Sequence, residues 1–102
     1  MTNRQLLCEL GYDDSIIFEN PDYDSAIVGV SEDNKVIYDF YQMVQYLMHN
    51  EHMTEEEATD FIYYNTIRSL PYAGEGAPII MYSLKDLCWQ LNKRGKTWTN
   101  KH

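Results

Sequence analysis

Residues 25–48 read SAIVGVSEDNKVIYDFYQMVQYLM, and this stretch decides the fold. Its first part contains two short runs, 25–30 and 35–39, that are rich in β-branched residues and separated by four polar residues, which predicts a β-hairpin. Asp39 then stands where a helix N-cap is expected. Apolar side chains follow it at the spacing i, i+3, i+4, i+7 and i+8, namely Phe40, Met43, Val44, Leu47 and Met48. This spacing predicts a helix that lays one face on the core.

On the N-terminal side of this stretch, the sequence predicts one helix and one further strand. Thr2 is the expected N-cap of the helix, and Gly11 the residue that ends it. Three leucines form the expected apolar stripe of this helix: Leu6, Leu7 and Leu10. Residues 15–19, SIIFE, form a β-branched and aromatic run that ends at Asn20-Pro21, and they predict a strand.

On the C-terminal side, the sequence predicts two more helices with a strand between them. Thr54 and Glu57 have the spacing of a capping box, and the stripe Ala58, Phe61 and Ile62 follows before Asn65 interrupts it. Residues 78–82, PIIMY, predict a strand that is buried on both faces. Ser83 is the expected cap of a last helix, which ends at Gly95 and has these residues in register: Leu84, Leu87, Cys88 and Leu91.

The predicted order of elements is α-β-β-β-α-α-β-α, which gives an α+β fold. We expect a small, mainly antiparallel sheet of about four strands with helices packed on one side. A chain of 102 residues has the size of one domain. Residues 1–95 are therefore predicted to form a single acidic α+β domain, and residues 96–102 a basic C-terminal tail.

Charge is distributed unevenly along the chain, whose formal net charge is −8. Residues 1–82 contain three basic and fifteen acidic residues, a net charge of −12, whereas residues 83–102 carry +4. Such an acidic body repels nucleic acid and anionic membranes and attracts basic surfaces. The simpler interpretation, that the charge only keeps the protein soluble, remains open.

Other features of the sequence argue against several functional classes. The N-terminus lacks the apolar core of a signal peptide, and no apolar run approaches the roughly twenty residues of a membrane span, so we expect a cytoplasmic protein. Cys8 and Cys88 stand beside apolar residues, which predicts buried thiols rather than a disulfide or a nucleophile. No nucleophile motif or phosphate-binding loop is present, so neither an enzyme nor a cofactor is expected.

Metal binding has two weak candidates in the sequence. His49 and His52 have a spacing that places both on one helical face, but HNEH matches neither common zinc motif, and the dipole of a helix end explains histidines there equally well. Asn20, Asp22 and Asp24 alternate like the first ligands of a calcium loop, but the glycine and the final glutamate of that loop are missing. We therefore predict no metal.

Acidic residues form the main candidate site for a partner protein. Residues 13–33 contain seven acids and no Lys or Arg: Asp13, Asp14, Glu19, Asp22, Asp24, Glu32 and Asp33. These acids flank the predicted strands and are expected to gather at the same sheet ends. A second group stands in the first turns of the third helix, where the helix dipole alone favours acids: Glu55, Glu56, Glu57 and Asp60. Carboxylates spaced on a rigid scaffold can imitate phosphates and occupy a basic nucleic-acid channel.

A tyrosine-rich segment is the alternative candidate site. Arg68 is the only basic residue between Lys35 and Lys85, and it is accompanied by Tyr63, Tyr64 and Tyr72. In so acidic a body, Arg68 is expected to pair with a carboxylate or to stack on a tyrosine at a structural corner. The same residues also have the composition of a recognition patch, because Tyr and Arg are enriched at binding hot spots.

Two segments resemble a group of small, largely uncharacterised proteins of Gram-positive bacteria and their mobile elements. They are YNTIRSLPYAGEGAPIIMY and FENPDYDSAIVGVSEDNKVIYDFYQMVQYLM, and together they cover most of residues 18–82. The resemblance carries no known chemistry and therefore transfers no catalytic residue. In size and charge alone, the chain also resembles anti-CRISPR inhibitors, several of which imitate DNA.

The sequence therefore predicts a non-catalytic binding protein. Our first hypothesis is an inhibitor of a nucleic-acid-binding protein, such as a CRISPR effector nuclease, that acts by DNA mimicry through its acidic face. The alternative is a housekeeping or regulatory interaction module that uses the tyrosine patch, with a homodimer as one form. In neither case does the chain bind nucleic acid or a membrane itself.

Overall fold

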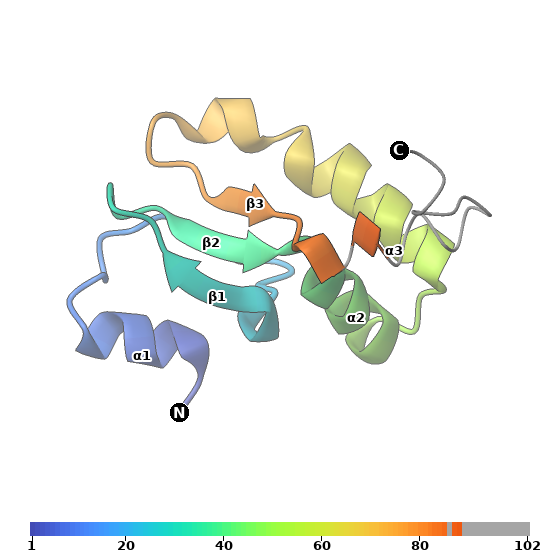
Figure 1. The fold of residues 1–102 in the computed structure, drawn as a ribbon, viewed down its shortest axis with the longest axis horizontal. Helices are drawn as coiled ribbons and strands as arrows, with labels where there is room; N and C mark the ends of the chain where they lie inside the picture. Colours follow the sequence, from blue (N-terminus) through green and yellow to red (C-terminus); the bar gives the residue numbers. More distant parts are fainter. Residues whose placement is uncertain (86, 89–102) are drawn as a thin grey trace.

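The computed structural model describes residues 1–85, 87 and 88, and its fold is α+β as predicted (Figure 1). Its helices are α1 (Asn3–Glu9), α2 (Phe40–Asn50) and α3 (Glu55–Phe61). Its strands are β1 (Ile27–Val30), β2 (Val36–Asp39) and β3 (Ile79–Met81). Three short helical segments complete the order: the 3-10 helix η1 (Asp24–Ala26), the π-helix η2 (Ile62–Ile67) and the 3-10 helix η3 (Leu70–Ala73).

The sheet is mixed, with β2 between β1 and β3. β1 pairs with β2 in antiparallel orientation, whereas β3 pairs with β2 in parallel, with Ile37 opposite Ile79. The prediction of a mainly antiparallel sheet of about four strands was therefore only partly right. The parallel pairing arises because the chain passes through α2, α3, η2 and η3 before it returns to the sheet, and a crossover of that length joins parallel strands.

The predicted strand at residues 15–19 is absent from this part of the described chain, which runs as a loop. Instead of joining a ladder, the backbone N–H of Phe18 donates to the side-chain hydroxyl of Tyr38 at 3.0 Å. The rings of these two residues also pack, with centroids 4.6 Å apart. Aromatic packing and one side-chain hydrogen bond thus hold this segment, and the β-branched composition of Ile16 and Ile17 was misleading.

The predicted hairpin is confirmed, with small shifts in its bounds. Its polar loop closes through the N–H of Ser31, which donates to the carbonyl of Lys35 at 2.8 Å, and through Asn34 in a left-handed conformation at φ +67°. Asparagine adopts this conformation more readily than most residues. The first part of the predicted strand 25–30 is instead η1, and a bulge follows between Ile27 and Gly29.

The core is built around α2, which packs against η1, α3 and β2, and the prediction that this helix lays one face on the core is confirmed. Asp39 caps α2 by accepting from the N–H of Gln42 at 3.0 Å, and the apolar face of the helix is almost completely buried. The buried hydrophobic residues of β2 and α2 are Val36, Tyr38, Phe40, Met43, Val44 and Leu47. Burying side chains of this size contributes roughly 1.5–3 kcal/mol each, so the burial of these residues is a large contribution to stability.

The first helix differs from its prediction. Thr2 caps α1 and forms a capping box with Gln5, but only Leu7 of the leucine stripe is buried. Leu6 is 46% and Leu10, the C-cap, 63% exposed, because a helix of seven residues that packs mainly on η1 presents little more than one turn to it. Cys8 is also exposed, so the prediction of a buried thiol at this position was wrong.

The third helix begins as predicted and then changes type. Thr54 accepts from the N–H of Glu57 and Glu57 accepts from the N–H of Thr54, which confirms the capping box. At Ile62 the chain enters the π-helix η2, whose wider turn exposes Asn65 and buries Thr66. The polar residue that interrupted the predicted apolar stripe therefore faces solvent.

The C-terminal part of the described chain begins with β3, an edge strand of the sheet. Ile79 is 36% exposed, so the prediction of a strand buried on both faces was wrong. Residues 84–85 and 87–88 are helical after Ser83, but Leu91, Gly95 and the predicted basic tail 96–102 lie outside the described residues. No helix in the described part has the length and apolar character needed to cross a membrane.

Candidate partner-binding surface

The seven acids of residues 13–33 do not form one patch. Four of them lie at the hairpin end of the sheet, because the Ser15 hydroxyl donates to the carbonyl of Asn34 at 2.9 Å and so brings the segment before it beside the hairpin loop. These four are all exposed: Asp13, Asp14, Glu32 and Asp33. We refer to them as the hairpin acids. Part of the negative charge thus lies on two segments that meet beside the hairpin loop.

One of the hairpin acids is partly neutralised. Asp33 accepts from the hydroxyl of Ser31 and pairs with Lys35, whose Nζ lies 3.4 Å from its carboxylate. The Ser31 hydrogen bond, with a smaller contribution from Lys35, lowers the pKa of Asp33. Asp33 and Lys35 also line an open hollow of about 530 Å³ together with Glu75 and Gly76. This end therefore offers charge but already contains a cation.

Two further acids of the group have a structural role. The carboxylate of Asp24 accepts from the backbone N–H groups of Asn3 and Arg4 at 3.0 and 2.9 Å, which ties the start of α1 to η1. Asp22 pairs with the Arg4 guanidinium at 3.6 Å and accepts from the N–H of Asp24. Burial, a hydrogen bond to Asp22 and the nearby carboxylates raise the pKa of Tyr46. Because these contacts occupy them, Asp22 and Asp24 are poorly suited to a partner.

Glu19, the seventh acid, lies beside a small hollow of about 220 Å³. The floor and walls come from three parts of the chain that are distant in sequence: the loop before η1, the end of α3 and the π-helix η2. The lining residues are Phe18, Glu19, Asn20, Pro21, Tyr23, Phe61, Asn65, Thr66 and Ser69. We call this hollow the Glu19 pocket. It combines an exposed carboxylate with aromatic walls.

The second acidic group is divided by its position on α3. Glu55, Glu56 and Glu57 occupy the first turn, and Glu57 completes the capping box. Glu57 and Asp60 also line a groove of about 540 Å³ between α3 and the turn that precedes it. Its remaining lining residues are Glu51, His52, Met53, Phe61, Tyr64 and Asn65. We call this hollow the α3 groove.

The α3 groove and the Glu19 pocket lie on opposite sides of one helix surface. Both are lined by Phe61 and Asn65, so these two residues form the ridge between them. Four carboxylates line the two hollows, and neither hollow is lined by Lys or Arg: Glu19, Glu51, Glu57 and Asp60. The α3 groove combines a mainly apolar lining with carboxylates, which suits long basic side chains, because these have apolar stems and charged tips.

The tyrosine-rich segment is partly structural. Tyr63 packs on Phe40 with ring centroids 5.3 Å apart, and its hydroxyl lies 3.3 Å from that of Tyr82. Burial and this neighbouring hydroxyl raise the pKa of Tyr82. By contrast, Tyr64 is 66% and Tyr72 90% exposed. The predicted patch is therefore reduced to Tyr64, Tyr72 and Arg68.

Arg68 is exposed at the end of η2. It was expected to pair with a carboxylate or to stack on a tyrosine. Within residues 1–85, 87 and 88, the ion pairs are those of Arg4 and Lys35, and Arg68 makes neither an ion pair nor an aromatic stacking contact. Its structural role was therefore overestimated, and its guanidinium is accessible.

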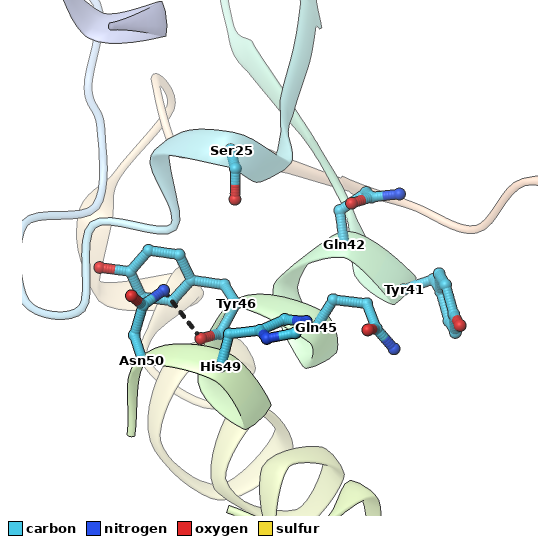
Figure 2. Close-up of a pocket in the computed structure, with 7 residues that line it drawn as sticks. All are labelled: Ser25, Tyr41, Gln42, Gln45, Tyr46, His49 and Asn50. Carbon is cyan, nitrogen blue, oxygen red and sulfur yellow. Dashed lines mark hydrogen bonds between the residues drawn. The ribbon is translucent and has the colours of Figure 1, made fainter. Parts of the chain in front are cut away.

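The two candidate metal ligands, His49 at the end of α2 and His52 in the turn after it, do not share a helical face and lie in different hollows. His52 lines the α3 groove, whereas His49 lines a hollow of about 390 Å³ on the outer face of α2. Figure 2 shows Tyr41, Gln45 and His49 extending from α2, with Ser25 of η1 opposite and Asn50 donating to the Tyr46 carbonyl at 3.0 Å. No carboxylate lines this hollow, and the described residues contain no cluster of three potential metal ligands.

Sequence reasoning missed the residues that join the two hollows. Phe61 was assigned to the core stripe, Asn65 was noted as an interruption of that stripe, and Glu51 was considered only beside the two histidines and not as a partner-binding acid. The available signal was Asn65 itself, because a polar residue in an apolar stripe can mark a change of helix type. The loop around Asn20 and η2 come together only through tertiary packing. No local sequence pattern predicts that contact.

Comparison with known proteins adds no relative: no family model, curated protein or solved structure matches this chain.

Proposed function

We propose that this chain is a non-catalytic protein that binds a basic surface of a nucleic-acid-binding protein and competes there with nucleic acid. The observation that carries the proposal is the pair of hollows on either side of Phe61, which are lined by four carboxylates and by no Lys or Arg. A surface that binds phosphates is rich in exposed Lys and Arg side chains. Carboxylates set in grooves offer such side chains both charge and contact area.

The hairpin acids extend this charge along the molecule. They lie at the opposite end of the view from the start of α3 (Figure 1). A basic channel that holds a nucleic-acid backbone is itself extended, so separated acidic sites suit it better than one compact patch. A CRISPR effector nuclease is one partner of this kind, in keeping with the size and charge of the chain.

The proposal is tested by competition with DNA. A purified CRISPR effector nuclease is loaded with labelled duplex DNA, and the displacement of the duplex by this protein is measured at several salt concentrations. We expect displacement, with an affinity that falls on the order of a hundredfold or more between low and physiological salt, because several charge contacts are screened together. Binding that is independent of salt, or that leaves the duplex in place, contradicts DNA mimicry for that partner.

A second candidate function is a regulatory interaction module that uses Tyr64, Tyr72 and Arg68. The exposure of both tyrosines and the accessible guanidinium support it. Binding through aromatic contacts tolerates salt, so Tyr72→Ala or Arg68→Ala would weaken it at high salt, and a homodimer would be detected by sedimentation. Salt-resistant association that is lost in these variants favours this function over the first.

A further inference from the structure

The Glu19 pocket is built from unusual backbone. On one side, Tyr23 adopts a left-handed conformation at φ +48°, which a residue with a bulky side chain rarely does. On the other side is the π-helix η2, a helix type that occurs frequently at functional sites. Backbone of this kind persists only where the surrounding packing enforces it. Unusual backbone on both sides of one small hollow makes this pocket the strongest candidate for a specific binding site.

The base of the pocket is fixed and its polar atoms are satisfied. The Tyr23 and Thr66 hydroxyls share a hydrogen bond of 2.9 Å, and both residues are buried. The ring of Phe18 meets that of Tyr23 edge to face, with centroids 5.8 Å apart. The base is therefore a rigid aromatic surface that does not itself need a hydrogen-bonding ligand.

The rim of the pocket is rich in hydrogen-bond acceptors. The Asn65 amide N–H₂ donates to the carbonyl of Phe61 at 3.1 Å, which leaves its oxygen as an acceptor. The Ser69 hydroxyl donates to the carbonyl of Thr66 at 2.7 Å, so its remaining capacity is also to accept. The carboxylate of Glu19 accepts only. A ligand with several donors and a positive charge matches these acceptors.

The volume of the pocket limits the size of that ligand. A hollow of about 220 Å³ is smaller than the roughly 300–1,000 Å³ of pockets that hold drug-sized ligands, and this size suits a single side chain. An arginine side chain has seven non-hydrogen atoms beyond its Cα. Its guanidinium provides five N–H donors and no acceptor, and its plane stacks on aromatic rings.

We propose that the Glu19 pocket binds a single arginine side chain of the partner. This inference rests on the proposed function, because it names the partner residue that one of the two hollows receives. The guanidinium stacks on the aromatic wall formed by Phe18 and Phe61 and donates to Glu19, Asn65 and Ser69. Lysine binds less well, because its ammonium has three donors and no planar face.

The inference is tested with N-acetyl-arginine amide, which needs no partner protein. We follow the side-chain amide of Asn65 and the backbone amides of residues 18–23 and 65–69 by NMR during the titration. The arginine probe should shift these signals and reach saturation with a dissociation constant on the order of millimolar, as expected for a fragment of this size. The corresponding lysine amide should bind at least threefold more weakly, and the neutral citrulline amide should not bind.

Two variants with the same change of charge provide the control. Glu19→Gln should weaken arginine binding about five- to tenfold, whereas Glu32→Gln, at the hairpin end, should leave it within twofold of the parent. Both side chains are exposed, so both variants should fold. Equal weakening by both, or equal binding of arginine and citrulline amides, overturns the inference.

Failure of the arginine pocket and failure of the proposed function give different results. If the arginine probe fails to bind while the parent chain still displaces DNA from its partner, the arginine pocket is wrong and the proposed function stands. If the probe binds as expected but the chain does not compete with DNA, the pocket stands and DNA mimicry toward that nuclease is wrong.

Discussion

The hairpin end carries the hairpin acids, and the α3–η2 surface contains the α3 groove and the Glu19 pocket. Both regions are acidic, but the surroundings of their carboxylates differ. The hairpin acids are exposed on a loop, and Lys35 pairs with Asp33 within that group. On the α3–η2 surface, carboxylates border two hollows that have aromatic walls and are lined by no Lys or Arg. The same type of residue therefore lies in two different environments.

This difference suggests separate roles in the rate of association and in the affinity of the complex. Exposed carboxylates on a loop act mainly through their long-range field, which steers a basic partner and raises the association rate. Carboxylates beside an apolar hollow can also hold a side chain that becomes desolvated on binding, and such residues dominate binding energy. We therefore expect affinity to depend on the α3–η2 surface and association rate to depend on both regions.

Charge reversal in each region gives the largest expected effect. Glu51→Lys with Asp60→Lys changes the α3 groove by four charges, and Asp13→Lys with Asp14→Lys does the same at the hairpin end. For an oligoarginine peptide at low salt, the groove variant should lose at least a hundredfold in affinity, about 3 kcal/mol, and the hairpin variant about tenfold. Isothermal titration calorimetry measures both losses.

Neither pair of substitutions removes a side-chain cap, because the capping box of α3 is formed by Thr54 and Glu57, and Glu51, the C-cap of α2, acts there through its backbone N–H. Circular dichroism should therefore show both variants folded. If the two variants lose affinity equally, the hollows contribute nothing beyond charge, and the distinction between the two regions is wrong.

The two regions are also expected to differ in how much free energy of unfolding one hydrogen bond contributes. Tyr23→Phe leaves the buried Thr66 hydroxyl without its partner and should cost about 1–2 kcal/mol of unfolding free energy. Ser15→Ala removes the exposed bond to Asn34 at the hairpin end and should cost less than about 0.5 kcal/mol. Urea denaturation of both variants measures the difference.

A double variant tests the interpretation of the first of these losses. Thr66→Val removes the other hydroxyl with little change in shape, so Tyr23→Phe combined with Thr66→Val should cost less than the sum of the two single changes. Strict additivity would mean that the two hydroxyls do not stabilise each other, and that the base of the Glu19 pocket is held by packing alone.

The parts of the fold that follow from local pattern were predicted from the sequence. Asp39 followed by the spacing of Phe40, Met43, Val44 and Leu47 specified α2, and the Thr54–Glu57 pair specified the start of α3. The polar residues between two β-branched runs specified the hairpin. In each case the deciding interactions lie within a few residues of one another, so the sequence contains them directly.

The parts that depend on distant contacts were not predicted. Residues 15–19 have strand composition, but Phe18 is held by Tyr38 in a loop, and β3 pairs in parallel because of the long crossover. The acids of residues 13–33 are close in sequence, yet Asp24 is used to hold α1. Proximity in sequence was thus a poor guide to which carboxylates share a surface.

The smallest expected effect is a change in thermal stability at alkaline pH. It concerns the loop around Phe18, which Tyr38 holds. Burial raises the pKa of Tyr38 to about 12, against an ordinary value of 10.0, and a weaker opposing contribution comes from its hydrogen bond with Phe18. Because the pKa is raised in the folded state, the stabilising contribution is complete below pH 10 and is lost as the pH rises toward 12. At pH 11 the loss should be on the order of 1 kcal/mol, seen as a lower melting temperature.

Tyr38→Phe should be less stable than the parent at neutral pH, because the N–H of Phe18 loses its acceptor, but its melting temperature should change less with alkaline pH. Tyr72→Phe, at a fully exposed tyrosine, should follow the parent curve. If Tyr38→Phe and the parent respond identically to alkaline pH, Tyr38 does not hold the loop that carries Glu19. The Glu19 pocket would then be no more rigid than the hairpin end. The two regions would differ only in the shape of their surfaces.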